Sequence, residues 1–419
     1  MRFSELTHDL RDATVFLDID GTLVGDKQSD IAPDALEKIR ALAAHNDVYL
    51  SSNGDPFRAA ALAKAAGVQA LPQLRKPLPH AAVRSIERRE RVVVIGDKFL
   101  TDGIFARLIG AEFIKVVRLR GEADDAFARF AYLLDDLVWH AAPYLQLMRP
   151  QQWVKNSLVF APIFFAGAFF VPSAFIAALV CFVAFSTLAS AVYVVNDLRD
   201  LEADREHPVK ARRPLPSGTV SKLSAILLAI ALTLVTCILL FLIPTAIPVF
   251  LVYALLNLAY TFSLKHVPVI DISLVASFYV LRVVAGGAAA AIALSPWIVL
   301  ATFFVALFLV SGKRQGEFTH TVRRKVLDGY SEQMLGYLLI SSAVLAIAFY
   351  GLWAIFTHPS TAAAYSTILV ATVFFRMLNI MTTDPARAES PELLVFKDGW
   401  TFGLTVFWTL VLAAIFYLP

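Results

Sequence analysis

Cysteine is almost absent from this chain, with only two among 419 residues. Cys181 and Cys237 both lie inside apolar runs, so we expect packing roles for them, and neither a disulfide framework nor a cysteine metal site. The first residues are polar and acidic and lack the basic patch and apolar core of a signal peptide. We therefore expect the N-terminal part to stay in the cytoplasm.

Charge is also scarce over much of the chain. Residues 1 to about 120 mix charged and apolar side chains, whereas residues 157–419 are apolar runs broken by short polar connectors. The contrast predicts one soluble α/β domain followed by an all-α polytopic membrane domain with about nine transmembrane helices. The apolar stretches cover about 157–171, 173–195, 221–243, 246–264, 269–290, 296–312, 334–357, 361–381 and 399–418.

The connectors differ in their basic residues. Those near Pro172, Pro244, Ser295 and Pro359 contain no Lys or Arg, whereas those after the second, fourth, sixth and eighth stretches all contain Lys or Arg. The positive-inside rule then places the N-terminus and every charged loop on the cytoplasmic side of a bacterial-type inner (plasma) membrane.

The N-terminal part alternates predicted strands and helices, which is typical of a doubly wound, Rossmann-like parallel sheet. Asp18 and Asp20 directly follow the first apolar strand, and such sheets place their sites at the carboxyl ends of strands. The expected strands cover 13–17, 47–51 and 92–95, and the expected helices 33–44, 57–66 and 81–88.

Four motifs of this part, DIDGTLV, SSN, KP and GDKFLTD, resemble in their order those of the haloacid dehalogenase superfamily of phosphatases, over residues 12–120. The resemblance implies that Asp18 is the nucleophile, Asp20 the acid/base and Lys76 the cation that neutralises a phosphoaspartate. Ser52 would position the phosphate, with Ser51 as the alternative. The implied Mg²⁺ ligands are Asp18, Asp20, Asp97 and Asp102.

The chemistry of such a site is self-consistent, because an aspartyl-phosphate intermediate needs a carboxylate, a metal and a cation around one phosphoryl group. The spacings between the motifs leave no room for a cap domain, and caplessness is associated in this superfamily with bulky substrates. A degenerate regulatory copy of a phosphatase is the alternative interpretation.

The segment NDLRDLEADREHPVKARRPLPSG, residues 196–218, concentrates charge between two apolar runs. Asp197, Asp200 and Asp204 stand at i, i+3 and i+7, so one helix would present all three on one face. Like charges so placed repel, and this density of hard oxygen ligands suits Mg²⁺ bridging to substrate phosphates. The alternative is a solvated loop whose bases only orient the protein. The bases that follow are Lys210, Arg212 and Arg213.

Further charges lie at or inside the apolar stretches. Lys265 and Asp271 flank the start of the fifth stretch, and Arg282 lies deeper in it. A charge at membrane depth costs about 2.5–3.5 kcal/mol on insertion scales, so we expect Arg282 to be functional. Arg376 is either functional or snorkels to the interface. Gly286 and Gly287 are expected to allow close helix packing.

The motifs NDLRDLEAD and YTFSLKHVPVID resemble the two motifs of the UbiA-type intramembrane prenyltransferase superfamily, over about residues 147–419. Together with RPQQWVKN, LRVVAGG and GKRQGE, they are similar to its decaprenyl-phosphate phosphoribosyltransferase-like branch. That branch implies 5-phosphoribosyl pyrophosphate as donor and a polyprenyl phosphate as acceptor. Asp271 would orient Lys265 or a ribose hydroxyl. The candidate substrate-binding residues are Lys155, Asn196, Lys210, Arg212, Arg213, Tyr260, Lys265, Arg282, Lys313 and Arg314.

The domains expected are a phosphatase domain (1–120), a connecting amphipathic helix (121–147) and a transferase domain (148–419). The helix carries Phe127, Phe130 and Leu137 at near-helical spacing and would lie against one domain or the bilayer surface.

The two domains together predict a bifunctional Mg²⁺-dependent enzyme that transfers 5-phosphoribose to the lipid and then removes the 5-phosphate. One alternative is a prenyltransferase acting on an aromatic quinone precursor beside an unrelated phosphatase. The other makes the first domain a metal- or phosphate-sensing regulator. We expect no nucleic-acid partner, and an oligomer is compatible with the sequence.

Overall fold

The computed structural model describes residues 1–7, 10–25, 28, 30–72, 74–79, 83, 85–121, 125–318, 325–357, 361–384 and 391–418. They divide into two compact units, Met1–Pro143 and Tyr144–Pro419. The boundary lies inside one long helix, α5 (Ala126–Met148). Each unit has its own apolar clusters and is described separately.

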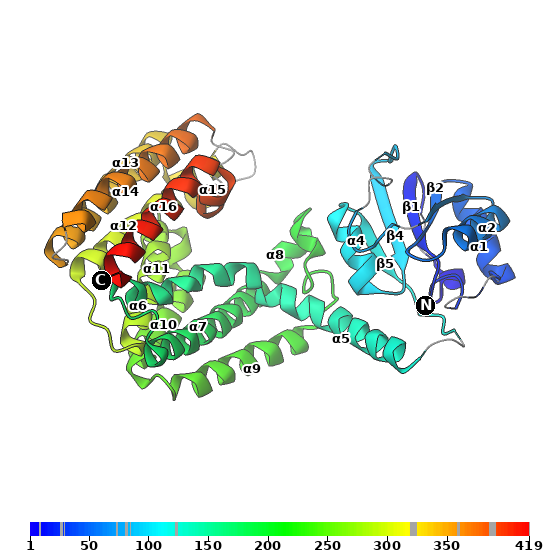
Figure 1. Ribbon diagram of the computed structural model, residues 1–419, viewed down its shortest axis with the longest axis horizontal. Coiled ribbons are helices and arrows are strands. Elements are labelled where there is room, and N and C mark those ends of the chain that lie inside the picture. Colours follow the sequence, from blue (N-terminus) through cyan, green and yellow to red (C-terminus); the bar gives the residue numbers. More distant parts are fainter. Residues whose placement is uncertain are drawn as a thin grey trace. The chain divides into compact units, whose positions relative to one another are not determined.

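A five-stranded parallel sheet forms the centre of the first unit (Figure 1). The central strand is β1 (Ala13–Asp18), whose six residues are all buried. The carboxyl ends of β1 and its two neighbours meet at one edge, with Asp18 opposite Ser51. The predicted parallel sheet is therefore confirmed, and two short edge strands were not predicted. The order is β3 (Gln69–Pro72), β2 (Asp47–Ser52), β1, β4 (Arg91–Gly96) and β5 (Glu112–Lys115).

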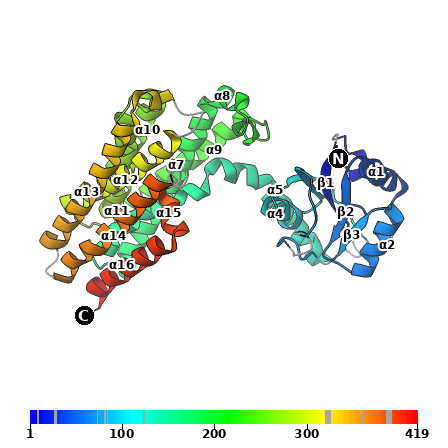
Figure 2. The same cartoon turned by 90° about the horizontal axis from the view of Figure 1, so that it is seen from above.

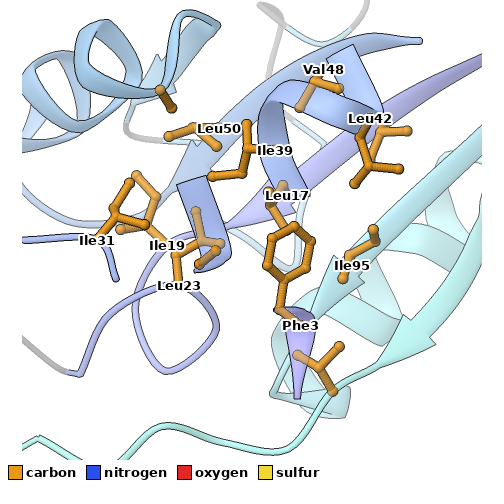
Figure 3. Close-up of a cluster of buried hydrophobic side chains, with 14 of the residues drawn as sticks. Phe3, Leu17, Ile19, Leu23, Ile31, Ile39, Leu42, Val48, Leu50 and Ile95 are labelled. Atoms are coloured by element: carbon orange, nitrogen blue, oxygen red, sulfur yellow. The ribbon is translucent and has the colours of Figure 1, made fainter. Parts of the chain in front are cut away.

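Helices cover both faces of this sheet because side chains alternate along each strand. Leu17, Leu50 and Ile95 face one side, where they join α1 (Pro33–Ala43) and α2 (Pro56–Ala66) in the apolar cluster of Figure 3. Phe16 and Val94 face the other side and pack with α4 (Ile104–Leu108). Figure 2 shows α1 and α2 next to the sheet from a second direction.

Local sequence explains where these helices begin and end. Asp55 accepts the Phe57 amide at 2.9 Å and Pro56 follows it, so α2 has a side-chain cap and a favourable first residue. Gly67 ends α2 with a φ of +74°. The helix predicted over 81–88 lies partly outside the described residues, and residues 85–88 are not helical. Two further short elements are η1 (Phe3–Glu5) and a π-helix, η2 (Phe99–Gly103).

The second unit is a helical bundle (Figures 1 and 2). Within its described residues, eight helices are long and apolar enough to cross a membrane. The long helices are α7 (Pro172–Arg199), α9 (Lys222–Leu240), α10 (Ile247–Phe262), α11 (Ile270–Ala289), α12 (Pro296–Phe318), α13 (Glu332–Thr357), α14 (Thr361–Thr383) and α16 (Gly399–Tyr417). The shorter ones are α8 (Leu201–Glu206), η4 (Lys210–Arg212), η5 (Pro244–Ala246), η6 (Leu264–His266), η7 (Lys325–Gly329) and α15 (Pro391–Lys397).

The first apolar stretch, 157–171, is not one of the eight long helices, so the prediction of about nine is corrected. A 3₁₀-helix, η3 (Pro150–Phe160), leads into the short α6 (Ala161–Phe165). This segment runs antiparallel to α7, because Trp153 bonds to Ser190 and Asn156 to Ser186, each at 3.0 Å. It therefore follows α7 over much of its length without being a regular α-helix.

Close packing against α11 accompanies this conformation. A Cβ placed on Gly286 would lie 2.0 Å from the Val159 carbonyl oxygen, so only glycine lets η3 approach this closely. The predicted packing role of Gly286 is therefore confirmed. The chain leaves α6 through Gly167, whose φ of +68° favours glycine.

Candidate functional site

Three buried carboxylates of the first unit converge at the carboxyl edge of its sheet. Asp18 ends β1, Asp97 follows β4, and Asp102 lies in η2. Each offers an oxygen within 4.8 Å of the others, and no other group of at least three His, Cys, Asp or Glu residues meets this criterion in the described part of the chain. Hard oxygen ligands in such an array fit Mg²⁺. Gly96 makes room for the array, because a Cβ there would lie 2.5 Å from Asp102 Oδ2.

Lys76 supplies the positive charge of this cluster. Its Nζ lies 2.5 Å from both Asp18 Oδ1 and Asp102 Oδ1. Asn53 holds the Lys76 backbone, accepting its amide at 2.7 Å and donating to its carbonyl at 2.9 Å. Burial by itself would lower the pKa of Lys76, but the two carboxylates together raise it above its usual range. The lysine therefore stays protonated between them.

Burial, together with the Asp102 carboxylate, raises the pKa of Asp18 to about 7 in the absence of a metal, although Lys76 opposes the change. Thr22 Oγ1 donates to Asp18 Oδ2 at 3.3 Å. The cluster thus concentrates negative charge that a bound cation would stabilise.

Asp20 lies beside these carboxylates and has different partners. It forms an ion pair with Arg58 of α2, and Ser52 Oγ lies 3.3 Å from its Oδ2. Ser52 also accepts the Gly54 amide at 2.8 Å. Of the two serines considered, Ser52 is the one whose hydroxyl reaches Asp20. The sequence interpretation did not include Arg58, which contacts Asp20 from another element.

The spacing predicted that the aspartate segment of the second unit forms one continuous helix, and this prediction is wrong. The chain breaks at Asp200, which ends α7 and begins α8 with φ −88° and ψ 9°. Asp197 thus belongs to α7 and Asp204 to α8, and both are buried. The three carboxylates therefore do not line one helix face, because Asp197 and Asp204 lie on two helices that meet at Asp200.

Each of these aspartates faces a basic side chain. Asp197 Oδ1 lies 2.5 Å from Arg149, the first residue of the RPQQWVKN motif, which was not among the candidate substrate-binding residues. Asp204 lies 3.0 Å from Arg213 and 3.2 Å from Lys210, and Arg213 is also 3.7 Å from Asp197. Acidic and basic groups of the 196–218 segment therefore form one network.

The second motif joins this network. Lys265 Nζ lies 3.6 Å from Asp200 Oδ1, and Thr261 donates to Asn196 Oδ1 at 2.8 Å. The two motifs therefore meet, although α9 and most of α10 lie between them along the chain.

Asp271 has partners other than Lys265, which was one of the two alternatives predicted for it. The structure pairs it with Arg314 at 3.1 Å and with the Tyr330 hydroxyl at 2.6 Å, not with Lys265. Arg314 also reaches Glu317 at 2.8 Å. Asp271 is fully buried, and its ion pair with Arg314 is therefore internal. Tyr330, which the motifs did not indicate, orients this carboxylate.

Arg282 is buried among neutral groups. It donates to Asn156 Oδ1 at 2.7 Å and to the Phe278 carbonyl at 2.6 Å. Its guanidinium also lies over the Phe185 and Tyr253 rings. These contacts stabilise a cation at membrane depth without a bonded carboxylate among the partners described.

The remaining predicted residues take varied positions. Lys155, Arg149 and Arg282 all lie close enough to Tyr193 of α7 to interact with it electrostatically. Tyr260 packs on Phe278 and interacts electrostatically with Arg314. Lys313 is half-buried, and Arg212 is exposed. Arg376 pairs with Asp398 at 2.9 Å, which gives it a structural partner.

Comparison with known proteins concerns this second unit. The model of the UbiA prenyltransferase family matches residues 157–315. The decaprenyl-phosphate phosphoribosyltransferase of Mycobacterium tuberculosis is 35% identical over 283 residues, which are 65% of this chain and 94% of that protein. A protein of the same name from Corynebacterium glutamicum is 36% identical over 289 residues, 66% of this chain and 87% of that protein.

A solved structure shares the fold. The UbiA homolog from Archaeoglobus fulgidus bound to GPP and Mg²⁺ aligns with a TM-score of 0.53 and 16% identity, over 65% of this chain and 99% of that one. Mg²⁺ is thus a ligand within the family. The family model matches residues 157–315, and two relatives are 35% and 36% identical to this chain over most of their own length. The chain therefore belongs to the UbiA prenyltransferase family.

Proposed function

We propose that the second unit transfers a 5-phosphoribosyl group from 5-phosphoribosyl pyrophosphate to a polyprenyl phosphate. The observation that carries the proposal is the network in which Asp197, Asp200 and Asp204 face Arg149, Lys210, Arg213 and Lys265. A donor with a pyrophosphate and a further phosphate needs more positive charge than a prenyl diphosphate does. The names of the two relatives, which match most of their length, support the same substrates.

In this reaction, an oxygen of the lipid phosphate bonds to the anomeric carbon as the bond from that carbon to pyrophosphate breaks. Pyrophosphate leaves with the electron pair, and the acceptor is already an anion, so no strong general base is required. Asp197, Asp200 and Asp204 do not meet the distance criterion that the Asp18 cluster meets, but Asp197 and Asp204 both lie within 4 Å of Arg213 Nη1. Mg²⁺ held by these aspartates together with the donor phosphates would supply charge for the leaving group. Arg149, Lys210 and Arg213 would hold phosphate oxygens, and fixed charge of this kind is usually the largest catalytic term.

The test uses membranes that contain the full chain, labelled 5-phosphoribosyl pyrophosphate and a polyprenyl phosphate. We expect label in the lipid with wild type, and loss of transfer by at least about 10²-fold with Asp204→Asn. Glu202→Gln is the matched control, because Glu202 lies on the same short helix and pairs only with exposed Arg205 and Lys222 among the contacts described. Label transfer that depends instead on a prenyl diphosphate and an aromatic acceptor would favour the quinone-precursor alternative.

We further propose that residues 1–120 of the first unit form a capless haloacid dehalogenase-like phosphatase that removes the 5-phosphate from the lipid-linked product. What supports it is the buried cluster of Asp18, Asp97, Asp102 and Lys76 at the carboxyl edge of a parallel sheet. Asp18 would attack phosphorus while Asp20 gives a proton to the departing ribose oxygen. A water that Asp20 deprotonates would then release inorganic phosphate and restore Asp18.

We propose that both reactions take place on the cytoplasmic side of a bacterial plasma membrane. The connectors that follow α7, α10, α12 and α14 contain Lys or Arg, whereas those near Pro172, Pro244, Ser295 and Pro359 contain none, and the positive-inside rule places the basic connectors in the cytoplasm. The water-soluble donor would then be available on the side where transfer occurs, and the first unit would reach the lipid product on that same side.

A further inference from the structure

The connecting helix α5 contributes a buried carboxylate to the first unit. Asp135 is only 3% exposed, although it lies on a helix whose apolar residues Phe127, Phe130 and Leu137 are 78%, 58% and 61% exposed. The apolar stripe predicted for this helix is thus not the face that contacts the sheet domain. Tyr132, Asp135 and Trp139 form that face instead.

Asp135 holds the beginning of η2. Its Oδ2 accepts the Phe99 amide at 3.0 Å and its Oδ1 accepts the Leu100 amide at 2.7 Å. These are the first two amides of a helical turn, which have no partner within the turn itself. Lys98, the residue just before the turn, provides no side-chain bond to them. The helix that carries Asp102 is therefore capped by a residue from α5.

A second connection runs from Asp135 to Asp97. Arg118 Nε lies 2.5 Å from Asp97 Oδ2, and Arg118 Nη2 lies 3.4 Å from Asp135 Oδ2. The Arg118 guanidinium stacks on the Tyr132 ring of α5 at 4.1 Å. Burial by itself would raise the pKa of Asp135, but the two amides and Lys115 lower it. The carboxylate is therefore charged in the folded protein.

We propose that Asp135 is a positioning residue for the metal-binding carboxylates: by fixing η2 directly and Asp97 through Arg118, it sets the geometry in which Asp18, Asp97 and Asp102 bind a divalent cation. Docking of α5 then determines how well the cluster holds its metal. The inference deepens the proposed phosphatase function, and only its activity measurement rests on that function.

The experiment compares full-length Asp135→Asn and Asp136→Asn in detergent. Asp136 is the matched control, because it also bonds to Lys115, at 2.9 Å, and reaches Arg118 only at 3.9 Å, but is 54% exposed on its side chain and has no bond to η2 among those described. Hydrogen exchange measures the amides of peptides covering residues 97–103. Exchange there should become about tenfold faster in Asp135→Asn, the factor expected for one lost hydrogen bond, and stay unchanged in Asp136→Asn.

The second measurement is the Mg²⁺ concentration that gives half-maximal hydrolysis of p-nitrophenyl phosphate. We expect it to rise about tenfold in Asp135→Asn, with the maximal rate at saturating Mg²⁺ largely restored, and to stay at the wild-type value in Asp136→Asn. A merely structural contact would lower the rate without this restoration. Asp135→Glu, which keeps the charge, should recover part of the shift.

The outcomes separate the two proposals. A wild-type protein without phosphatase activity contradicts the phosphatase function, and the exchange data alone then decide the role of Asp135. Equal exchange at residues 97–103 in the two Asn variants overturns that role. Faster exchange spread over β1 and β2 in both Asp135→Asn and Asp135→Glu also overturns it, because Asp135 would then support the whole unit.

Discussion

Lys265 lies 3.6 Å from Asp200, so a base of the second motif faces the residue at which the first motif bends. The pairing places a cation from the loop between α10 and α11 among the carboxylates of α7 and α8. The sequence had suggested that Asp271 orients either Lys265 or a ribose hydroxyl. Asp271 pairs with Arg314 and Tyr330, and Lys265 pairs with Asp200 of the aspartate network.

Replacing Lys265 tests its place in donor binding. Lys265→Ala should raise the KM for 5-phosphoribosyl pyrophosphate about tenfold or more, because a charge-assisted hydrogen bond to phosphate is lost, and should change the KM for the lipid much less. Lys222→Ala is the control, since Lys222 is exposed and contacts Glu202. Steady-state kinetics in detergent would measure both constants, and equal increases for the two substrates would show general disruption instead.

Replacing Tyr330 tests the shape of the second motif. Its hydroxyl donates to Asp271 and accepts the Val269 amide at 2.5 Å, and Val269 has a φ of +69° that is costly for a β-branched residue. Tyr330→Phe should cost about 1–3 kcal/mol and reduce transfer. Tyr337→Phe, at a 64% exposed position on α13, should do neither. The unfolding midpoint in detergent is the measurement, and matching midpoints for the two variants would contradict the role of Tyr330.

Replacing Gly286 tests the contact between α11 and η3. Gly286→Ala would put a Cβ against the Val159 carbonyl oxygen, and overpacking of this kind typically costs about 1–3 kcal/mol. Gly336→Ala is the matched helical control, because nothing lies within 4 Å of its Cβ position. It should be neutral or stabilising by up to about 1 kcal/mol. The comparison of thermal midpoints would refute the packing argument if Gly286→Ala unfolded at or above the wild-type temperature.

Residues that follow parallel strands were predictable because such strands bring their carboxyl ends to one edge. Asp18 and Asp97 therefore come together as the strand pattern indicated, with Asp102 one helical turn further along. Arg58, Arg118 and Asp135 were not predictable in this way. Arg58 contacts Asp20 from α2, Arg118 contacts Asp97 from the segment after β5, and Asp135 contacts η2 from α5. A single charged residue in a sequence gives no sign of a partner that is distant along the chain.

The apolar runs predicted the positions of the membrane segments more accurately than the conformation of those segments. Hydropathy is the same for a 3₁₀-helix and an α-helix, so η3 was expected to be regular. Its conformation accompanies the close approach at Gly286, a tertiary contact that no local pattern encodes. Tertiary contacts also accompany the bend at Asp200, because Lys265 pairs with Asp200 itself and Arg213 pairs with Asp197 and Asp204 on either side of it.

The central claim is that the two units act in sequence on one lipid. Asp18→Asn removes the proposed phosphatase nucleophile, so transfer should continue while dephosphorylation stops. With labelled 5-phosphoribosyl pyrophosphate and a polyprenyl phosphate, we expect wild type to give lipid-linked ribose and Asp18→Asn to accumulate lipid-linked ribose 5-phosphate.

Asp20→Asn should give the same product less completely, because the loss of a general acid/base typically costs about 10²–10⁴-fold. Thin-layer separation of the labelled lipids distinguishes the two species. The same phosphorylated lipid from wild type and Asp18→Asn would contradict the account, and would leave the first unit as a regulator or as a phosphatase for another substrate.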